Sequence, residues 1–419
     1  MNLTISLCFQ EINSLEHGLN RAELWTTALI YFGDMNKTSG FIFHSGSEYK
    51  ALRRFTLKTL RDLGFGKHSS EEIILEECEC MKTCINKMIE ESDGVVELDK
   101  LFNKAALNVV WNVTAAERFD YDDKKMENLY NFMELFMLLG KHIIGKPLGI
   151  FPSLRFIPPF RGIFKEASEG MAESREFIRK TIEAHEQTLD VDNPRDYIDK
   201  FLIASRDDPT LNKDNLLFCC LDLFIGGSET TSKSLMYALV MILRHPEVHD
   251  KVAEEIARVT GPNDRVTLED REKLPYTEAT LNEVWRFCNV VPIPPPRKLS
   301  SPIKIGNYEI PGQTMFMTSS YSVHMDQQYW KDPETFRPER FFHEGSFRPD
   351  ERNIPFGIGK RRCLGETLAR MENFLFFANL MKHFSFRCVE GSDPPDTRPM
   401  AGFTNGPAPF CMKVVKNSQ

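Results

Sequence analysis

"PFGIGKRRCLGE", residues 355–366, decides how this chain of 419 residues is interpreted. Cys363 follows three basic residues and directly precedes a stretch with the hydrophobic periodicity of a helix. Positive charge and the N-terminus of a helix both stabilise an anionic sulfur. Gly359 and Gly365, on either side of the cysteine, allow the backbone to approach a bulky group. The pattern therefore predicts a thiolate that holds a metal.

Two other kinds of cysteine site were weighed against this interpretation. A zinc site is not favoured, because no second Cys or His lies within the usual short ligand spacing of Cys363. A nucleophilic cysteine stays open, because cysteines of low pKa occur at helix N-termini, although the sequence offers no obvious His partner.

The composition limits the class of protein. With 42% hydrophobic and 27% charged residues, the chain is ordinary for a soluble globular protein that buries a large core. A net charge of −8 argues against a dedicated nucleic-acid binder, which would be basic. Ten irregularly spaced cysteines predict reduced thiols in the cytosol. No apolar run approaches the ~20 residues that a membrane-spanning helix needs.

The hydrophobic pattern predicts a mainly α protein of the α+β type. Residues 3–9 alternate as in a strand and follow no basic segment, so a signal peptide is not predicted. Short strands are expected over 297–320, with a hairpin around Gly306 and Asn307, and again over 384–415. No linker interrupts the chain, so we expect one domain, a large helical part with a small sheet region, over residues 1–419. The predicted helices are 49–63, 70–92, 98–117, 125–145, 162–188, 193–205, 211–244, 246–259, 275–288 and 364–383.

The cysteine loop matches the pattern F-x-x-G-x-R-x-C-x-G. The matching residues are Phe356, Gly359, Arg361, Cys363 and Gly365. In this loop the chain resembles the cytochromes P450, which are haem-thiolate monooxygenases. The resemblance implies the P450 fold, haem b (iron protoporphyrin IX) as cofactor and Cys363 as the axial ligand of its iron. It also implies that Phe356 packs against the haem near the sulfur, and that the backbone N–H groups of Leu364 and Gly365 adjust the redox potential of the haem iron.

A second motif precedes the loop. "LNEVWRF" places Glu283 and Arg286 three residues apart, so that they share one face of a helix and can pair. Such pairs are usually solvated, but "FRPERF" follows with Arg340. The resemblance implies that these three residues form a buried network that shapes the loop around Cys363. Their implied role is structural.

A third motif, "FIGGSETTSKSL", covers residues 224–235. Glycine and threonine are poor helix formers, and a threonine that bonds back to an earlier carbonyl bends a helix, so a plain kink would also explain this stretch. It resembles the family's A/G-G-x-D/E-T-T pattern, which implies that it crosses the oxygen-binding face of the haem. Glu229 and Thr230 are then the acid and the alcohol that guide protons to oxygen. The matching residues are Gly226, Gly227, Glu229, Thr230 and Thr231.

A fourth motif concerns the haem propionates. "SEYKALRRF" resembles the family's Trp-x-x-x-Arg helix, with Tyr49 in the Trp position and Arg53 in the Arg position. Periodicity places Arg53 on one stripe with Leu57 and Leu60, so we expect it to point inward, where a guanidinium needs an anion. The resemblance implies that this anion is a propionate. Arg297, after "PIPPP", is implied as a second basic partner, and Arg361 of the loop is counted among the haem-binding residues.

The resemblance implies an activity and its partners. One oxygen atom from O2 is inserted into a lipophilic substrate such as a steroid, fatty acid, terpenoid or xenobiotic. Electrons come from NADPH through a separate flavoprotein reductase, with cytochrome b5 as a further possible donor. Nucleic acid is not expected as a partner. The basic stripe where the reductase would dock, otherwise an ordinary solvated face, consists of Lys50, Arg54, Lys58 and Arg61.

The pattern looks closest to the animal microsomal class, which implies the cytosolic face of the endoplasmic reticulum membrane. That class begins with a membrane anchor and a first helix, and we expect both to be missing from this sequence. Residues 145–164 are rich in aromatics and prolines. They are interpreted either as a packed loop or as a surface that dips into a membrane or lines an apolar channel.

Two other functions stay open. One is a haem-thiolate isomerase or dehydratase, which needs neither oxygen nor a reductase; the Glu229–Thr230 pair argues against it. The other is a truncated, non-catalytic chain that binds haem or another ligand. Consumption of NADPH with a supplied reductase distinguishes the two enzymes, and haem content distinguishes both from the inactive chain.

Overall fold

The computed structural model describes residues 19–21, 39–65, 68–131, 151–261, 265–400, 402 and 404–417. Most of this part of the chain is helical, as the sequence predicted, and none of its helices has the length and hydrophobicity to cross a bilayer. The α-helices are α3 (Gly46–Asp62), α4 (His68–Glu91), α5 (Asp99–Ala115), α8 (Phe160–Thr188), α9 (Tyr197–Ala204), α10 (Lys213–Arg244), α11 (Pro246–Val259), α12 (Pro275–Cys288), α13 (Ser320–His324), α14 (Gln327–Trp330) and α15 (Glu366–His383). Residues 124–131 are also helical. The 3-10 helices are η2 (Pro152–Phe156), η3 (Leu268–Lys273), η4 (Pro338–Arg340) and η5 (Gly359–Arg361).

The strands form four small antiparallel sheets, in the orders β1-β3-β6, β2-β10-β9, β4-β5 and β7-β8. The predicted hairpin is confirmed: Ile305 pairs with Tyr308 across Gly306, whose φ of 57° lies in the left-handed region that favours glycine. The strands are β1 (Leu19–Arg21), β2 (Val95–Val96), β3 (Arg297–Leu299), β4 (Ile303–Ile305), β5 (Tyr308–Ile310), β6 (Met315–Phe316), β7 (Phe342–His343), β8 (Ser346–Phe347), β9 (Phe384–Arg387) and β10 (Met412–Lys416).

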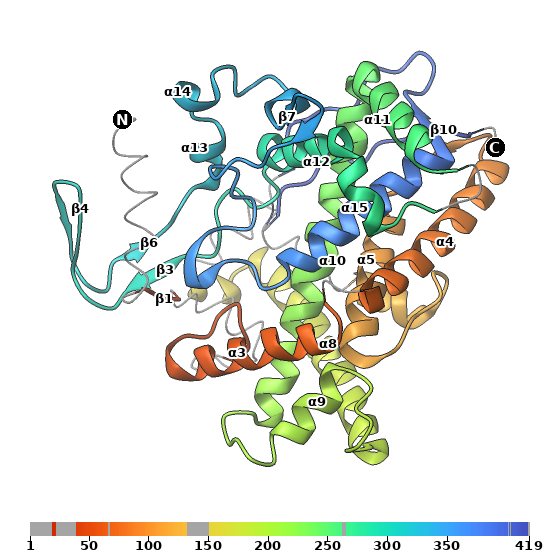
Figure 1. Ribbon diagram of the computed structural model, residues 1–419. Helices are drawn as coiled ribbons and strands as arrows, with labels where there is room; N and C mark the ends of the chain where they lie inside the picture. The colour runs from red at the N-terminus through yellow and green to blue at the C-terminus, as the bar shows by residue number, and fades with distance from the viewer. Residues whose placement is uncertain are drawn as a thin grey trace.

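Helix α10 organises the fold. It runs through the middle of the molecule, with β1, β3, β4 and β6 on one side and α4, α11 and α15 on the other (Figure 1). Its residues 235–243 pack with residues of α4, α5, α11, α12 and α15 in one hydrophobic cluster. Its residues 216–225 pack with residues of α3, α5, α8 and α9 in a second cluster. Residues 226–234 belong to neither cluster, so a polar stretch of α10 separates the two cores.

Helix boundaries follow capping side chains that the periodicity did not show. The helix predicted over 193–205 begins at Tyr197, because the Asp196 side chain accepts a hydrogen bond from the Asp199 N–H and caps it. The helix predicted over 211–244 begins at Lys213, because Asn212 caps it in the same way. The other predicted helices that lie within the described residues are confirmed to within three residues at each end.

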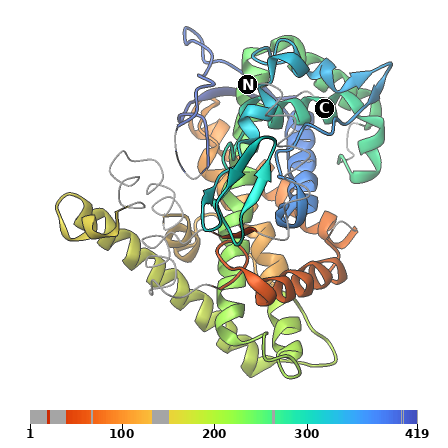
Figure 2. The ribbon, with the colours of Figure 1, turned by 90° about the vertical axis from the view of Figure 1, so that its left-hand side faces the viewer.

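Some sequence predictions fall outside the described residues. These are the strand over 3–9, the part of the 125–145 helix after residue 131, and residues 145–150 of the aromatic segment. The rest of that segment forms η2 and the start of α8. Helix α8 runs from there along the outside of the molecule (Figure 2).

A buried histidine joins α8 to α9. His185 Nδ1 lies 2.8 Å from the Thr181 carbonyl, and its Nε2 lies 2.8 Å from Asp196 Oδ2. Both partners only accept hydrogen bonds, so satisfying both requires the doubly protonated imidazolium. Burial lowers the pKa of His185, but the hydrogen bond and charge of Asp196 outweigh burial, so the pKa is raised overall. A buried ion pair therefore fixes the junction between these helices.

We expect this pair to make stability depend on pH. Because the pKa of His185 is raised in the folded chain, its contribution is fully present below about pH 6.5 and is lost as the pH rises through the folded-state pKa, by at most about 1.4 kcal/mol per pH unit. Urea unfolding at several pH values between 6 and 9 should show this decline in wild type and not in His185→Gln. The exposed His343→Gln variant serves as control. Equal pH slopes in wild type and His185→Gln would contradict the assignment.

Candidate active site

The cysteine loop is a tight turn before α15. Cys363 lies two residues after η5, and its N–H donates to the Phe356 carbonyl at 2.9 Å. Gly359 takes a left-handed φ of 76°, which a side chain would strain. The helix predicted from residue 364 begins at Glu366, so Cys363 lies just outside the helix, where the first backbone N–H groups point toward it.

The surroundings of Cys363 act on the pKa of its thiol in opposite directions. Burial raises the pKa of the Cys363 thiol. Hydrogen bonds from the backbone N–H groups of Gly365 and Glu366 and the charge of Arg53 oppose this increase without cancelling it. The predicted Leu364 N–H is not among these donors; instead, the Leu364 side chain packs against the second hydrophobic cluster.

Cys363 nevertheless borders an open space. Its side chain is exposed to solvent, although the surrounding protein desolvates the thiol enough to raise its pKa. The position of a Cβ on Gly365 would meet no atom within 4 Å.

Phe356 is held between two helices. Its ring makes an edge contact with Trp285 of α12, with ring centroids 5.6 Å apart, and the Arg370 guanidinium of α15 lies 4.8 Å from its centroid. Arg370 also bonds Glu366 at 3.0 Å, and Glu366 in turn bonds Arg362. The sequence did not single out Arg370 or Glu366. Their only sequence signal is an i,i+4 charge pair at the start of the helix.

Basic groups gather between the loop and α3. The Arg361 guanidinium lies over the ring of buried Tyr49, 3.4 Å from its centroid, and donates to the His44 carbonyl at 2.9 Å. Burial lowers the pKa of Arg361, and the positive charges of Arg297 and Arg53 lower it further, whereas Tyr49 opposes them. The predicted haem-binding residues Tyr49, Arg53, Arg297 and Arg361 are thus brought together, and an anion would relieve their mutual repulsion.

The side chain of Arg53 differs from the prediction in its neighbours. The expected stripe is correct only in part: Leu60 is buried, but Leu57 is 38% exposed, and the buried face of α3 runs through Leu52, Thr56 and Leu60. Arg53 lies at the edge of that face and donates from Nη2 to the Arg362 carbonyl at 2.6 Å. It therefore ties α3 to the cysteine loop. The basic stripe of Lys50, Arg54, Lys58 and Arg61 is exposed, as predicted.

On α10, the predicted kink residues face two directions: Gly226 faces an open space, whereas Gly227 faces α5. Gly226 is exposed in the middle of a buried helix, and a Cβ there would meet no atom within 4 Å. The Thr230 hydroxyl donates to the Gly226 carbonyl at 2.8 Å, the back-bond that the sequence predicted. Gly227, which was expected beside the haem, instead faces α5: a Cβ there would lie 2.5 Å from Val110 Cγ2. Its missing side chain lets the two helices pack closely.

The acids next to Thr230 are buried. Glu229 is 1% exposed. The Thr231 hydroxyl donates to Glu372 Oε2 of α15 at 3.0 Å, and burial raises the pKa of Glu372 well above the usual range of a carboxyl. Glu372 was missed from the sequence. A glutamate within the apolar run "RMENFLFF" was the available signal.

The predicted structural network is confirmed. Arg286 donates to both carboxylate oxygens of Glu283, at 2.7 and 2.8 Å, and both side chains are 0% exposed. Arg340 Nε donates to Glu283 Oε1 at 3.3 Å. Arg286 also donates to the carbonyls of His324 and Pro333, so α12 holds the segment that leads to the cysteine loop.

The sequence predicts a substrate lining drawn from Phe218, Leu221, Asp222 and Ile225, from residues 290–294 and from the turn of residues 400–406, and the structure brings these segments together only in part. The Asn405 N–H donates to the Val290 carbonyl at 2.7 Å, so the 400–406 turn and the segment after α12 meet as expected. Asp222 departs from the prediction, because its carboxylate accepts the N–H groups of Phe41 and Ile42 and so anchors the chain before α3. Its role is to satisfy backbone donors.

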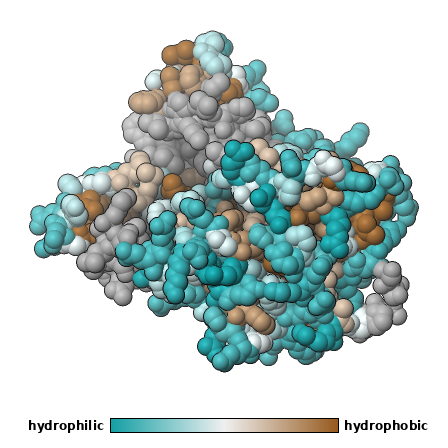
Figure 3. Space-filling view, turned by 90° about the horizontal axis from the view of Figure 1, so that it is seen from above, coloured by the Kyte–Doolittle hydropathy of each residue, from teal (hydrophilic) through white to brown (hydrophobic). Residues whose placement is uncertain are grey.

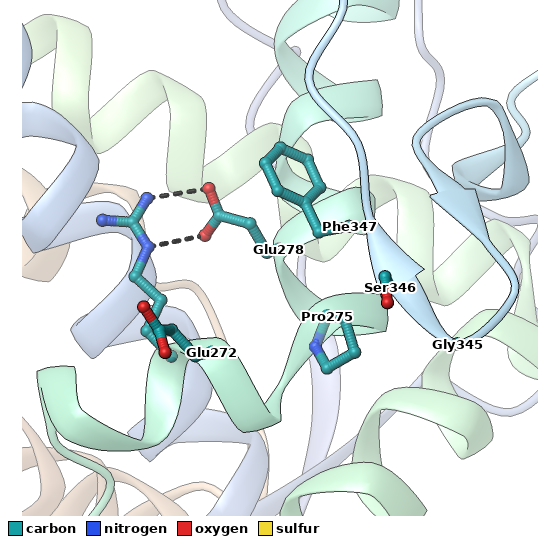
Figure 4. Close-up of a pocket in the computed structure, with 7 residues that line it drawn as sticks. Glu272, Pro275, Glu278, Gly345, Ser346 and Phe347 are labelled. Atoms are coloured by element: carbon teal, nitrogen blue, oxygen red, sulfur yellow. Dashed lines mark hydrogen bonds and ion pairs between the residues drawn. The ribbon is translucent and has the colours of Figure 1, made fainter.

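A separate pocket of about 380 Å³ lies between η3, α12 and β8 (Figure 4). The Arg271 guanidinium forms two hydrogen bonds with Glu278 at its wall. Its lining shares no residue with the surroundings of Cys363, so we assign it no part in the site. The lining residues are Arg271, Glu272, Pro275, Glu278, Gly345, Ser346 and Phe347.

These observations fit a haem. A thiolate-bound, planar and doubly anionic group needs a sulfur on one face, small residues on the other and cations at its edge. Exposed Cys363, the open space at Gly226 and the basic groups around Arg361 supply these three features.

Comparisons with known proteins agree. A family model described as Cytochrome P450 matches residues 20–414. Cytochrome P450 2J5 of Mus musculus is 37% identical over 355 residues, covering 83% of this chain and 70% of that protein. Cytochrome P450 2C28 of Mesocricetus auratus is 36% identical over 379 residues, 88% of this chain and 75% of that protein. Cytochrome P450 2U1 of Mus musculus is 35% identical over 390 residues, 91% of this chain and 73% of that protein.

We expect the buried network to dominate the stability of this region. Replacing Arg286 by Met leaves the Glu283 carboxylate buried without its main partner, which should lower the free energy of unfolding by about 3–5 kcal/mol. Urea unfolding followed by tryptophan fluorescence measures this. Arg348→Met, which breaks an exposed ion pair with Glu344, should cause little change. A similar small effect for both variants would contradict the structural role of the network.

Proposed function

The chain belongs to the cytochrome P450 family, and on this premise we propose that the Cys363 sulfur would hold the iron of a haem bound between the cysteine loop and α10. The observation that supports this most directly is the exposure of Cys363 just before α15, beside Gly365, where a Cβ would meet no atom within 4 Å. A thiol sulfur is only a weak acceptor for the two N–H groups directed at it, whereas a metal-bound thiolate would be a stronger acceptor for both.

As a family member the chain is a monooxygenase that inserts one oxygen atom from O2 into a lipophilic substrate. The bound haem supplies the oxidising chemistry, while the protein supplies binding, orientation and electrostatics. We propose haem b, because the sequence lacks the C-x-x-C-H pattern of covalently attached haem. The family match over residues 20–414 supports a single catalytic domain.

We assign the edge of the haem to the basic cluster. Arg361 and Arg297, with Arg53, would neutralise the two propionates, and Tyr49 positions the Arg361 guanidinium by lying under it. Phe356 would cover the sulfur side, where its ring is fixed by Trp285. Gly226 would allow α10 to approach the opposite face closely.

Proton delivery is assigned to Thr230 and Glu229. The Thr230 hydroxyl donates its proton in the hydrogen bond to the Gly226 carbonyl. Its oxygen can therefore still accept a hydrogen bond from a water molecule on the side of α10 where Gly226 is exposed. Glu229 lies one residue earlier and is buried, which suits a group that exchanges protons and is otherwise shielded from solvent.

Electrons are proposed to come from an NADPH-dependent flavoprotein reductase, or from cytochrome b5. The Arg53–Arg362 hydrogen bond holds the loop against α3, so the exposed cations of both elements lie together. An acidic patch on the donor would complement this surface. The exposed cations are Lys50, Arg54, Lys58, Arg61, Lys360 and Arg362.

We propose that the chain acts at a membrane surface, on the cytosolic face of the endoplasmic reticulum, on substrates such as steroids, fatty acids, terpenoids or xenobiotics. Phe151, Phe156 and Ile157, in and beside η2, are 59%, 69% and 53% exposed, which is unusual for large apolar residues grouped together. The surface seen from above is mainly hydrophilic, with hydrophobic residues gathered in a few places (Figure 3). An exposed apolar segment of this kind suits a lipid interface.

Replacing Cys363 by Ala should abolish the strongly red-shifted Soret band of the reduced, carbon monoxide-bound haem protein, because the thiolate ligand is lost. A carbon monoxide difference spectrum checks this. Cys411→Ala, which removes another exposed cysteine, should leave the band unchanged. If Cys363→Ala kept the band, Cys363 would not be the ligand.

Replacing Thr230 by Val removes the hydroxyl at constant size and should leave haem content unchanged. Product formation should fall by roughly 100-fold, the lower range for a positioned proton-transfer group, with NADPH consumption diverted to hydrogen peroxide. Product and peroxide per NADPH, measured with a supplied reductase, test this. Thr230→Ser keeps the hydroxyl and should stay close to wild type. Unchanged coupling in Thr230→Val would remove Thr230 from proton delivery.

A further inference from the structure

A buried histidine connects the ion-pair network to the cysteine loop. His324, the last residue of α13, is 0% exposed. Its carbonyl accepts a hydrogen bond from Arg286 Nη1 at 2.8 Å, and its Nε2 lies 2.9 Å from the backbone nitrogen of Ile354. Ile354 is two residues before Phe356, whose carbonyl accepts the Cys363 N–H. A continuous set of contacts therefore runs from α12 to Cys363.

The contacts of His324 determine its tautomer. A backbone N–H can only donate, so Nε2 must accept from Ile354 and the ring proton must lie on Nδ1. Nδ1 then donates to Asn289 Oδ1 at 3.0 Å. Burial and the charge of Arg286 lower the pKa of His324 to about 3, so the ring stays neutral near neutral pH. The neutral Nδ1–H form satisfies both partners.

Asn289, which accepts the hydrogen bond from His324 Nδ1, is itself fixed in position by the end of α12. It is the C-cap of α12, with a φ of 47° in the left-handed region that asparagine tolerates. Its Nδ2 donates to the Arg286 carbonyl at 3.0 Å, which leaves Oδ1 facing the histidine. The Ser320 hydroxyl lies 3.3 Å from the same Oδ1 and 3.0 Å from the carbonyls of Val291 and Pro292. The end of α12 therefore orients the imidazole ring through Asn289.

We propose that His324 is a positioning residue for the loop that carries Cys363: its Nε2 holds the Ile354 N–H and so sets where the loop leaves the α12 scaffold. This inference rests on the proposed role of Cys363 as haem ligand. Hydrogen bonds within the loop connect Ile354 to Cys363: the Gly357 N–H donates to the Ile354 carbonyl at 3.0 Å, and the Cys363 N–H donates to the Phe356 carbonyl at 2.9 Å. Asn353 Nδ2 also donates to the Asn282 carbonyl of α12 at 3.1 Å, so the His324 bond acts beside this second tie. A shift at Ile354 would displace the sulfur.

Two variants separate positioning from simple packing. His324→Leu fills the site with an apolar side chain that accepts no hydrogen bond, and leaves the part-buried Ile354 N–H without its partner. His324→Gln offers an amide oxygen to Ile354 and an amide N–H to Asn289, and so should rescue the contacts. His249→Leu, which replaces another buried histidine, in α11, is the matched control.

The first measurement is amide hydrogen exchange at Ile354 in the haem-free chain. We expect exchange in His324→Leu to be on the order of 10-fold faster than in wild type, which corresponds to a loss of about 1.4 kcal/mol, the scale of one hydrogen bond. His324→Gln and His249→Leu should exchange like wild type. Unchanged protection in His324→Leu would overturn the proposal, as would equal loss in the Leu and Gln variants, which would indicate packing alone.

The second measurement is the carbon monoxide spectrum of the haem-loaded proteins. His324→Leu should show a smaller fraction of the thiolate-type band, and a larger fraction of the band of haem that lacks the thiolate, than wild type or His324→Gln. Equal fractions in all variants would overturn the link to Cys363. A wild-type protein without the thiolate-type band would instead contradict the proposed function. The exchange rate at Ile354 would still test the hydrogen bond between the Ile354 N–H and His324 Nε2.

Discussion

The rest of the structure depends on one buried ion pair. Glu283 and Arg286 are both fully removed from solvent, where an unpaired charge would cost several kcal/mol, so every other lone pair and N–H group of the pair must also find a partner. Arg340 and the carbonyls of His324 and Pro333 meet this requirement. Satisfying two charges thus brings α12, α13 and the segment after α14 to one place, and the cysteine loop begins from there.

Helix α10 imposes the second constraint. Two hydrophobic cores meet along it, and between them residues 226–234 contribute glycine, serine, threonine and charged side chains rather than apolar ones. Such a stretch gives up burial energy and helix propensity in the middle of the most central helix. In return, a flat group can approach the backbone of α10 here. A Cβ on Gly226 would meet no atom, and the Thr230 side chain is fixed by its hydrogen bond to the Gly226 carbonyl. Departures from local stability of this kind mark functional sites.

Electrostatics at the cysteine illustrate why a loop motif alone is incomplete. The sequence shows three cations and a helix start beside Cys363, which argue for a thiolate. In the folded chain burial outweighs these effects and raises the pKa of the thiol. Two of the cations bind other groups: Arg361 donates to the His44 carbonyl, and Arg362 donates to the Glu366 carboxylate. The loop is therefore better suited to a sulfur that a metal has deprotonated than to a reactive free thiolate.

The sequence by itself determined the helical order, the hairpin at Gly306 and the residues around Cys363, because periodicity, turn chemistry and spaced motifs are local properties. The Glu283–Arg286–Arg340 network was implied by the family resemblance and not by the local pattern. Only the tertiary structure decided which face each residue meets. Gly227 faces Val110, and Asp222 accepts hydrogen bonds from the backbone before α3. Arg53 lies at the edge of the buried face of its helix, and His324 and Glu372 lie in the interior. The reason is physical: burial and hydrogen-bond partners come from segments distant in sequence, and they set both the pKa and the role of a side chain.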